Sequence, residues 1–259
     1  MSDLSKLRYG SFSIEEATKE KETLNSGSNY MKLEAGENLV RFLPPAEPGQ
    51  APYTKVYQHF INRGPADRPI VFNCPKRMNG GHCPACAKAD ALIATGNKAD
   101  KEEAMKLYPK LRVFYNVINR HDEEAGPQVL GVGKKIHEEL MGLRANARAG
   151  GDFFHPIEGF DVVIEKEGTG LNTKYTVNAV RNSSQLTDKL ETAQDWIDNQ
   201  DDHKQQAYVP SLEEVKAKLL GEGAPAKAAP KALQATTTVV ETELVEEDDD
   251  TDDLDDFGL

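Results

Sequence analysis

His59–Cys86 reads HFINRGPADRPIVFNCPKRMNGGHCPAC and holds all three cysteines of the chain, Cys74, Cys83 and Cys86. Cys83 and Cys86 form a Cys-x-x-Cys turn, which is short enough to direct two sulfurs at one ion. Zinc prefers four tetrahedral sulfur and nitrogen ligands, so a third cysteine and a histidine would complete a closed structural site. The stretch therefore predicts one structural Zn2+ that shapes a binding surface.

Two histidines compete for the fourth ligand position. His82 adjoins Cys83, so its side chain is expected to point away from an ion that Cys83 holds. His59 lies in an alternating, strand-like segment, which is a rigid place from which to present an imidazole. We predict the ligands His59, Cys74, Cys83 and Cys86, with His82 as the competing nitrogen. The alternative is that the cysteines are ordinary buried thiols.

The sequence lacks the motifs of a catalytic zinc, which needs an open coordination position and a nearby general base. The run His137–Met141 (HEELM) has no second histidine for a His-Glu-x-x-His helix. Zinc deaminases require a glutamate two residues after a histidine. No glutamate stands at that position after His59 or His82. The run Gly131–Lys135 (GVGKK) misses the first glycine and the Ser or Thr of a phosphate loop. We expect no enzymatic activity, and a metallonuclease is the weakest alternative.

Charge is unevenly distributed along the 259 residues. The net charge is −12, and eleven acidic residues with no basic one lie between Glu241 and Leu259. Between Tyr53 and Gly150, by contrast, sixteen Lys or Arg residues face ten Asp or Glu residues. The chain therefore combines a mildly basic middle with a separate anionic tail.

Other classes of protein are excluded by what the sequence lacks. No apolar run approaches the ~20 residues of a membrane span, and the N-terminus has no basic-then-apolar signal pattern. Three cysteines are an odd number for a disulfide framework, so we expect metal ligation in a reducing cytoplasm and no membrane partner.

Alternating apolar and polar residues predict several short strands. They are expected at 31–33, 39–43, 53–61, 70–72, 111–119, 128–132, 160–164 and 174–180. Residues 85–107 favour helix with a break near Gly96-Asn97, and 134–148 has the apolar spacing of a helix face. Short strands separated by turn signals, with one or two helices, predict a mainly β fold with α additions, a small antiparallel barrel or sandwich.

The domain boundaries follow from composition. We expect an N-terminal arm at 1–29, a core at 30–210 with a zinc subdomain at about 53–108, an amphipathic helix at 211–222, a flexible linker at 223–240 and an acidic tail at 241–259. The arm is either a mobile polar segment or a contact to a second copy of the chain through Lys6 and Arg8.

Basic and aromatic residues share the same third of the chain as the cysteines. Single-stranded nucleic acid is bound by a basic groove with aromatic faces on which bases stack. Part of the aromatic set is expected in the core, and tyrosines are the better surface candidates because the hydroxyl tolerates water. The predicted nucleic-acid contacts are Tyr53, Tyr57, Lys76, Arg77, Tyr108, Lys110, Arg112, Tyr115, Lys134 and Lys135.

The acidic tail is interpreted in two ways. A run of like charges is often a solvated solubility element. It can also occupy the protein's own cationic groove at low salt and offer apolar residues to a partner. The predicted partner-binding residues are Asp252, Asp253, Leu254, Asp255, Asp256 and Phe257.

From Tyr30 to Ser184 the chain resembles the single-stranded DNA-binding (ssDNA-binding) proteins of T4-like bacteriophages. Residues 39–44 (LVRFLP) are similar to that family's first core strand, and residues 130–136 to the run that ends a core strand and opens a helix. The order His, Cys, Cys-x-x-Cys matches its zinc subdomain. Lys110, Arg112 and Tyr115 match the strand that lines its DNA cleft.

The resemblance implies an OB-fold-like antiparallel β-barrel with an inserted zinc-ribbon-like subdomain and a disordered acidic C-terminal tail. It implies a protein that coats ssDNA during phage replication, recombination and repair in the cytoplasm of the infected bacterial host. Implied partners of the tail are a polymerase, a helicase or helicase loader and a recombinase mediator. An RNA-binding translational regulator and a zinc-ribbon protein-interaction scaffold remain alternatives.

Overall fold

The computed structural model describes residues 29–62, 69–146 and 151–220. The chain divides into two units, Met1–Tyr30 and Met31–Leu259, and the fold below is that of the second unit. The predictions for the arm up to residue 28, for the linker and for the acidic tail, including its disorder, lie outside the described residues.

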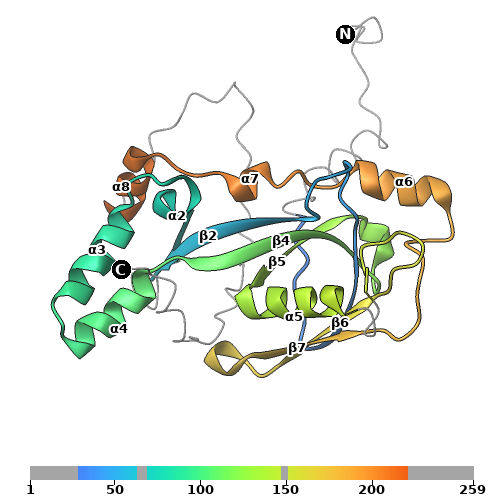
Figure 1. Ribbon diagram of the computed structural model, residues 1–259, viewed down its shortest axis with the longest axis horizontal. Coiled ribbons are helices and arrows are strands. Elements are labelled where there is room, and N and C mark those ends of the chain that lie inside the picture. Colours follow the sequence, from blue (N-terminus) through green and yellow to red (C-terminus); the bar gives the residue numbers. More distant parts are fainter. Residues whose placement is uncertain (1–28, 63–68, 147–150, 221–259) are drawn as a thin grey trace, which may run out of the picture. The chain divides into compact units, whose positions relative to one another are not determined.

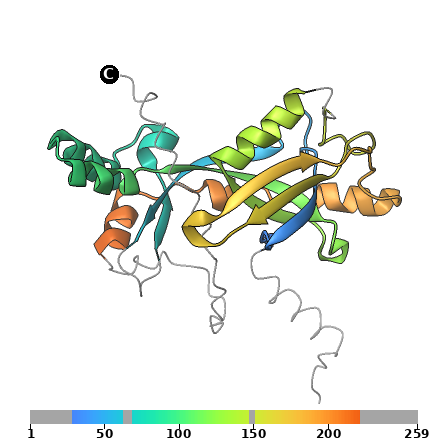
Figure 2. The same ribbon diagram turned by 90° about the horizontal axis from the view of Figure 1, so that it is seen from below.

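One antiparallel sheet organises the described part of the chain (Figures 1 and 2). Its seven strands are β1 (Gly36–Phe42), β2 (Tyr53–Ile61), β3 (Ile70–Asn73), β4 (Lys110–Asn119), β5 (Gln128–Gly133), β6 (Val162–Glu167) and β7 (Lys174–Ala179). The order is β3-β2-β4-β1-β6-β7, and β5 pairs with β4 outside this path.

Strand β4 is the centre of the sheet because three strands pair with it. Its first six residues pair with β2, residues 117–119 pair with β1, and residues 112–117 pair with β5. The predicted mainly β, OB-like fold is therefore confirmed.

The main core lies between this sheet and helix α5 (Lys134–Ala145; Figure 1), which packs against β4, β5 and β7. Val40 and Phe42 alternate with Arg41 on β1, and both reach this core. Ile136 and Leu140 lie one helical turn apart on α5 and complete this core on its helix side. Burying each such aliphatic or aromatic side chain stabilises the fold by about 1.5–3 kcal/mol relative to leaving it exposed.

The metal module is the insertion between β2 and β4. After β3 it comprises α2 (Pro75–Asn79), α3 (Pro84–Ala94) and α4 (Lys98–Leu107). Cys74 and Cys83 are the N-cap residues of α2 and α3, and a proline follows each as the first helical residue, where its missing N–H has no cost. Gly96 has φ +72°, and Asn97 caps α4, so the predicted break is confirmed.

The segment 199–220, which we name the C-terminal strap, leads from α6 (Leu190–Asp198) back to the metal module (Figure 1). It contains α7 (Lys204–Ala207) and α8 (Leu212–Leu220). Asn116 on β4 exchanges two hydrogen bonds with the backbone of Asp201. Further along, Asn73 donates to two backbone carbonyls of the strap, at 2.6 and 2.8 Å. The strap therefore ties β4 to β3.

Two expectations differ from the structure. Residues 31–33 form no strand, although the Met31 N–H donates to the Val129 carbonyl at 2.9 Å. The helix expected to reach residue 148 ends at Ala145 within the described residues. In the part of the chain that the structure describes, the two remaining short helices are η2 (Glu123–Ala125) and η4 (Gly170–Asn172). No described helix has the length and apolar character needed to cross a membrane.

Candidate metal centre and nucleic-acid interface

The four predicted metal ligands lie together. The ligand atoms of His59, Cys74, Cys83 and Cys86 are all within 4.8 Å of one another, and all four residues are buried. His59 Nε2 lies 3.2 Å from Cys83 Sγ and 3.7 Å from Cys86 Sγ, and the sulfurs of Cys74 and Cys86 are 3.5 Å apart. Tetrahedral ligands at ~2.3 Å from zinc stand roughly 3.5–3.8 Å apart. The cluster therefore fits one structural zinc.

Neighbouring groups hold the ligands in this orientation. His59 Nδ1 lies 2.7 Å from the Leu107 carbonyl at the end of α4, so this nitrogen donates its proton to that carbonyl and leaves Nε2 to face the sulfurs. The imidazole also stacks on Phe72, with ring centroids 4.8 Å apart. The Arg77 N–H donates to Cys74 Sγ at 3.4 Å. Contacts outside the ligand set therefore fix the histidine tautomer and orient one sulfur.

The protonation of the cluster also fits a metal site. Burial alone would lower the pKa of His59, but hydrogen bonds with Cys74 and Cys83 raise it to about 9. Hydrogen bonds from Cys74 and Cys86 lower the pKa of Cys83. A buried thiolate needs a positive partner, which a bound zinc would supply once the sulfurs and Nε2 of His59 have lost their protons.

The choice between the two histidines is settled by position. His82 is exposed and lies outside the ligand cluster, whereas His59 is 0% exposed. Strand β2 delivers the His59 imidazole to the cluster, as the alternating sequence predicted. The alternative of unrelated buried thiols does not account for a histidine nitrogen 3.2 Å from a cysteine sulfur.

Helix α8 covers the metal cluster. Val215 is fully buried and packs in one apolar cluster with Phe72, Cys74, Cys83 and Cys86, and Leu219 packs against its edge. Ser211 and Glu214 form a reciprocal capping box at the start of α8, with N···O distances of 2.7 and 3.3 Å. The metal module is therefore completed by the C-terminal end of the described chain.

A cation accompanies each Tyr and Phe side chain of β2. Lys55 Nζ lies 5.2 Å from the Tyr53 ring centroid, and Arg77 Cζ lies 4.8 Å from that of Tyr57. Arg112 Cζ lies 5.7 Å from the Phe60 ring. Such pairs are attractive, and they are also the residue types that bind bases and phosphates.

Strand periodicity divides these pairs between two faces. Tyr53, Lys55 and Tyr57 alternate along β2 and share one face, which we name the β2 face. Arg112 is the cross-strand partner of Val56, so its side chain belongs to the opposite face with that of Phe60. The structure thus brings Tyr53, Tyr57 and Arg77 together and separates them from Arg112.

Tyr115 is a correction. It was expected at the surface, but it is 0% exposed and lies in the main core, so its ring cannot stack on a base. Tyr115 Oη lies 2.6 Å from His137 Nδ1 on α5. Burial raises the pKa of Tyr115, so its O–H donates to the imidazole. Burial, and then the charge of Lys55, lower the pKa of His137 to about 4, so this histidine is neutral at pH 7.

The sequence reasoning missed His137 and Lys55 as neighbours of the predicted contacts. The Tyr53 ring stands edge-on to both Tyr115 and His137, at 5.5 and 5.2 Å. The buried pair therefore supports a half-buried tyrosine of the β2 face. Alternation of Tyr53, Lys55 and Tyr57 was the signal that could have added Lys55.

The remaining predicted contacts have different surroundings. Lys76 on α2 and Tyr108 after α4 both contact Asp90 on α3, at 3.0 and 2.8 Å. Lys110 is exposed on β4, and Lys134 and Lys135 are exposed at the start of α5. The tail residues 252–257 lie outside the described part of the chain.

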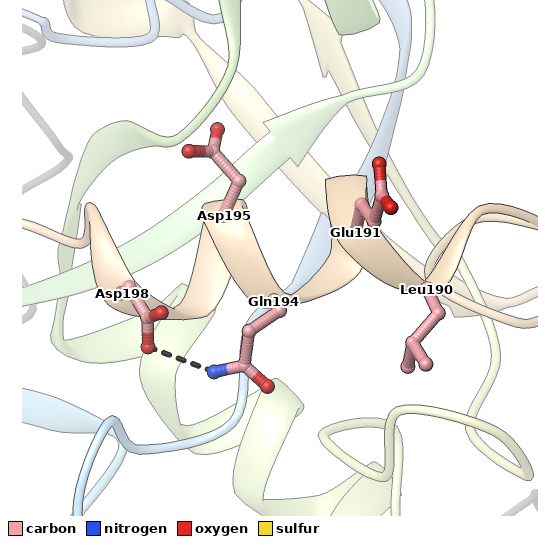
Figure 3. Close-up of a pocket in the computed structure, with 5 residues that line it drawn as sticks. All are labelled: Leu190, Glu191, Gln194, Asp195 and Asp198. Atoms are coloured by element: carbon pink, nitrogen blue, oxygen red, sulfur yellow. Dashed lines mark hydrogen bonds between the residues drawn. The ribbon is translucent and has the colours of Figure 1, made fainter.

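A hollow on α6 has the wrong charge for nucleic acid. It is lined by Leu190, Glu191, Gln194, Asp195 and Asp198 (Figure 3). Gln194 donates to Asp198 at 2.8 Å, and the carboxylates would repel phosphate. We place no site there.

Together, the fold and the site define a mainly antiparallel β protein braced by a Cys3His metal centre, with cation–aromatic pairs beside it. A family model described as gp32 DNA-binding-protein-like matches residues 34–221. The chain belongs to this family. A comparison with curated proteins finds no match.

Proposed function

We propose that this protein binds single-stranded DNA with little sequence preference and has no catalytic role. Membership of a DNA-binding family supports the proposal. The observation that carries it is the β2 face, where Tyr53 and Tyr57 stand with Lys55 and Arg77 next to a rigid metal centre. Rings and cations in alternation suit a strand whose bases stack and whose phosphates are charged.

The path of the DNA follows from the same face. Lys134 and Lys135, at the start of α5, lie across β4 from the Tyr57 end of β2, because Gly133 just before them pairs with Arg112, next to the Tyr57 partner Leu111. Tyr53 and Tyr57 would stack bases along β2, at ~1–3 kcal/mol per base. Arg77 on α2 continues the basic surface toward the metal module. Lys110 and Arg112 stay predicted contacts on the opposite face.

Binding to ssDNA should greatly exceed binding to duplex DNA of the same length. In a fluorescence anisotropy titration with oligo-dT and a matched duplex, we expect at least about tenfold tighter binding to oligo-dT, weakening as salt rises. Tyr57→Ala with Arg77→Ala should lower affinity about tenfold or more, since one stacked base and one phosphate contact are lost. Arg181→Ala is the matched control, because this exposed arginine follows β7.

Equal affinity for the two forms of DNA would contradict the proposal. Preference for RNA homopolymers over oligo-dT would favour the regulator alternative. Absence of binding to any oligonucleotide would favour the protein-interaction scaffold.

The biological setting belongs to the proposal as well. We infer that the protein coats exposed strands during phage DNA replication, recombination and repair in the cytoplasm of the infected host. The acidic tail would recruit replication proteins, with Leu254 and Phe257 among its aspartates as apolar contacts. The arm at 1–29 would join neighbouring copies on DNA.

Deletion of residues 241–259 should tighten ssDNA binding at low salt. The deletion removes eleven negative charges that compete with phosphate for the basic surface. We expect a gain of about tenfold at 20 mM salt that disappears near 0.5 M salt, where surface charges are screened. A chain with the same length of neutral Gly/Ser tail is the control. Unchanged low-salt affinity would exclude competition between tail and groove.

A further inference from the structure

We propose that Asp90 occupies the position of a DNA phosphate between Lys76 and Tyr108 and thereby restrains the ssDNA affinity of the protein. This inference rests on the proposed function, because it concerns two of the predicted contacts. It assigns a role to an acidic residue in a part of the chain where basic residues outnumber acidic ones.

The geometry around Asp90 is that of an anion site filled by the protein's own carboxylate. Lys76 Nζ lies 3.0 Å from Oδ2, and the Tyr108 hydroxyl donates to Oδ1 at 2.8 Å. The three residues come from α2, α3 and the end of α4. An ammonium and a phenol O–H converging on one anion are the donors that also bind phosphate oxygens.

The position is accessible to a nucleic acid. The side chains of Lys76 and Asp90 are 50% and 49% exposed, so the ion pair is screened by water and holds the helices together only weakly. Lys76 adjoins Arg77, which stands on the Tyr57 ring. Tyr108 follows Leu107 in the sequence, and the Leu107 carbonyl accepts a hydrogen bond from His59. His59 lies on the same face of β2 as Tyr57. The Asp90 site therefore continues the β2 face.

A strand that reaches this site must compete with the carboxylate. The phosphate must either displace Asp90 from Lys76 or bind while Asp90 still neutralises that lysine. In both cases the Asp90 carboxylate stays nearby and repels the phosphate. Removing the charge of Asp90 therefore frees one cation and removes one repulsion. Burial alone would raise the pKa of Asp90, but its hydrogen bonds with Lys76 and Tyr108 lower it, so this carboxyl is ionised at pH 7.

The same module contains a matched ion pair. Lys88 on α3 and Glu103 on α4 lie 3.4 Å apart, with side chains 62% and 56% exposed. Neither is a predicted DNA contact. Glu103→Gln therefore removes the same charge from the same module without touching Lys76 or Tyr108.

The experiment compares Asp90→Asn with Glu103→Gln in the full chain, by anisotropy with oligo-dT between 20 and 300 mM salt. We expect Asp90→Asn to raise low-salt affinity about fivefold and to steepen the slope of log K against log salt by ~0.7, one additional phosphate contact. Glu103→Gln should change affinity less than about twofold. Lys76→Ala combined with Asp90→Asn should cancel the gain. Zinc content should stay at one per chain in all variants.

Equal effects of the two substitutions would overturn the inference while leaving ssDNA binding intact. A loss of affinity in Asp90→Asn would also overturn it, since Asp90 would then support the site instead of restraining it. Asparagine carries an amide oxygen that could still accept a hydrogen bond from Lys76. Asp90→Ser therefore repeats the test without this amide, so that an effect specific to asparagine does not decide the result. Failure of the unsubstituted chain to bind oligo-dT is a separate outcome that rejects the proposed function itself.

Discussion

Replacing Cys86 with serine is expected to abolish stoichiometric zinc binding and to unfold the metal module. The substitution removes one of four ligands from a buried cluster and leaves two thiols and a histidine without a metal. Structural zinc supplies folding free energy directly, ~10–16 kcal/mol in small zinc domains, so its loss far exceeds that of an ordinary contact. Zinc analysis of the purified protein, followed by thermal unfolding, measures both effects.

The histidines provide matched variants for this prediction. His59→Ala should behave like Cys86→Ser, because His59 Nε2 lies within 3.7 Å of two sulfurs. His82→Ala should retain one zinc and its thermal midpoint, because His82 is exposed and outside the cluster. Full zinc in His59→Ala together with loss in His82→Ala would reverse the ligand assignment.

Metal loss should spread to α8 and spare the distant hairpin. Val215 packs on the cysteines, so hydrogen exchange in 212–220 should become faster when zinc is removed. Strands β6 and β7 pair with each other, and β6 also pairs with β1, away from the metal, so both should keep their protection. Equal exchange in α8 with and without zinc would show that the helix does not depend on the metal.

Gly159→Ala is expected to be the most damaging substitution outside the metal module. Gly159 is buried, and a Cβ there would meet the His155 carbonyl oxygen and would lie 2.7 Å from Arg41 Nη2. Arg41 is 0% exposed, and its Nη2 donates to the same carbonyl at 2.6 Å. Burial lowers the pKa of Arg41 to about 10, while the nearby charge of Asp161 raises it.

The cost of Gly159→Ala should be about 3 kcal/mol, because neither the backbone oxygen nor the buried guanidinium can move away. For a domain of this size the thermal midpoint should fall by roughly 6–12 °C. Gly142→Ala is the matched control. Gly142 is exposed in α5, and a Cβ there meets nothing within 4 Å, so alanine should stabilise the helix by about 0.5–1 kcal/mol. A similar midpoint for both variants would refute the steric argument.

The metal ligands and most strands could be predicted because local rules decide them. Cys74 and Cys83 are each followed by proline, which favours a helix start that turns the sulfur inward. Alternation along β2 correctly aimed His59 at the cysteines. Gly96 and Asn97 ended and restarted a helix for reasons of backbone conformation that need no tertiary contact.

The environment of Tyr115 could not be predicted in this way. Residues 113–118 of β4 are all buried, because strands flank β4 on both edges while α5 and the strap cover its faces. A strand covered on both faces loses the period of two that separates inside from outside. The meeting of Lys76, Asp90 and Tyr108 likewise depends on how three helices pack, which the local sequence does not encode.

The C-terminal strap has a consequence for the order of assembly. The metal cluster forms from residues 59–86, but its apolar cover, Val215, is synthesised much later. During synthesis the cysteines and Phe72 remain uncovered until α8 has left the ribosome, so early zinc capture would protect these thiols from oxidation and aggregation. Any shortened chain that ends before Leu212 lacks α8, so its cysteines and Phe72 would remain without their apolar cover permanently.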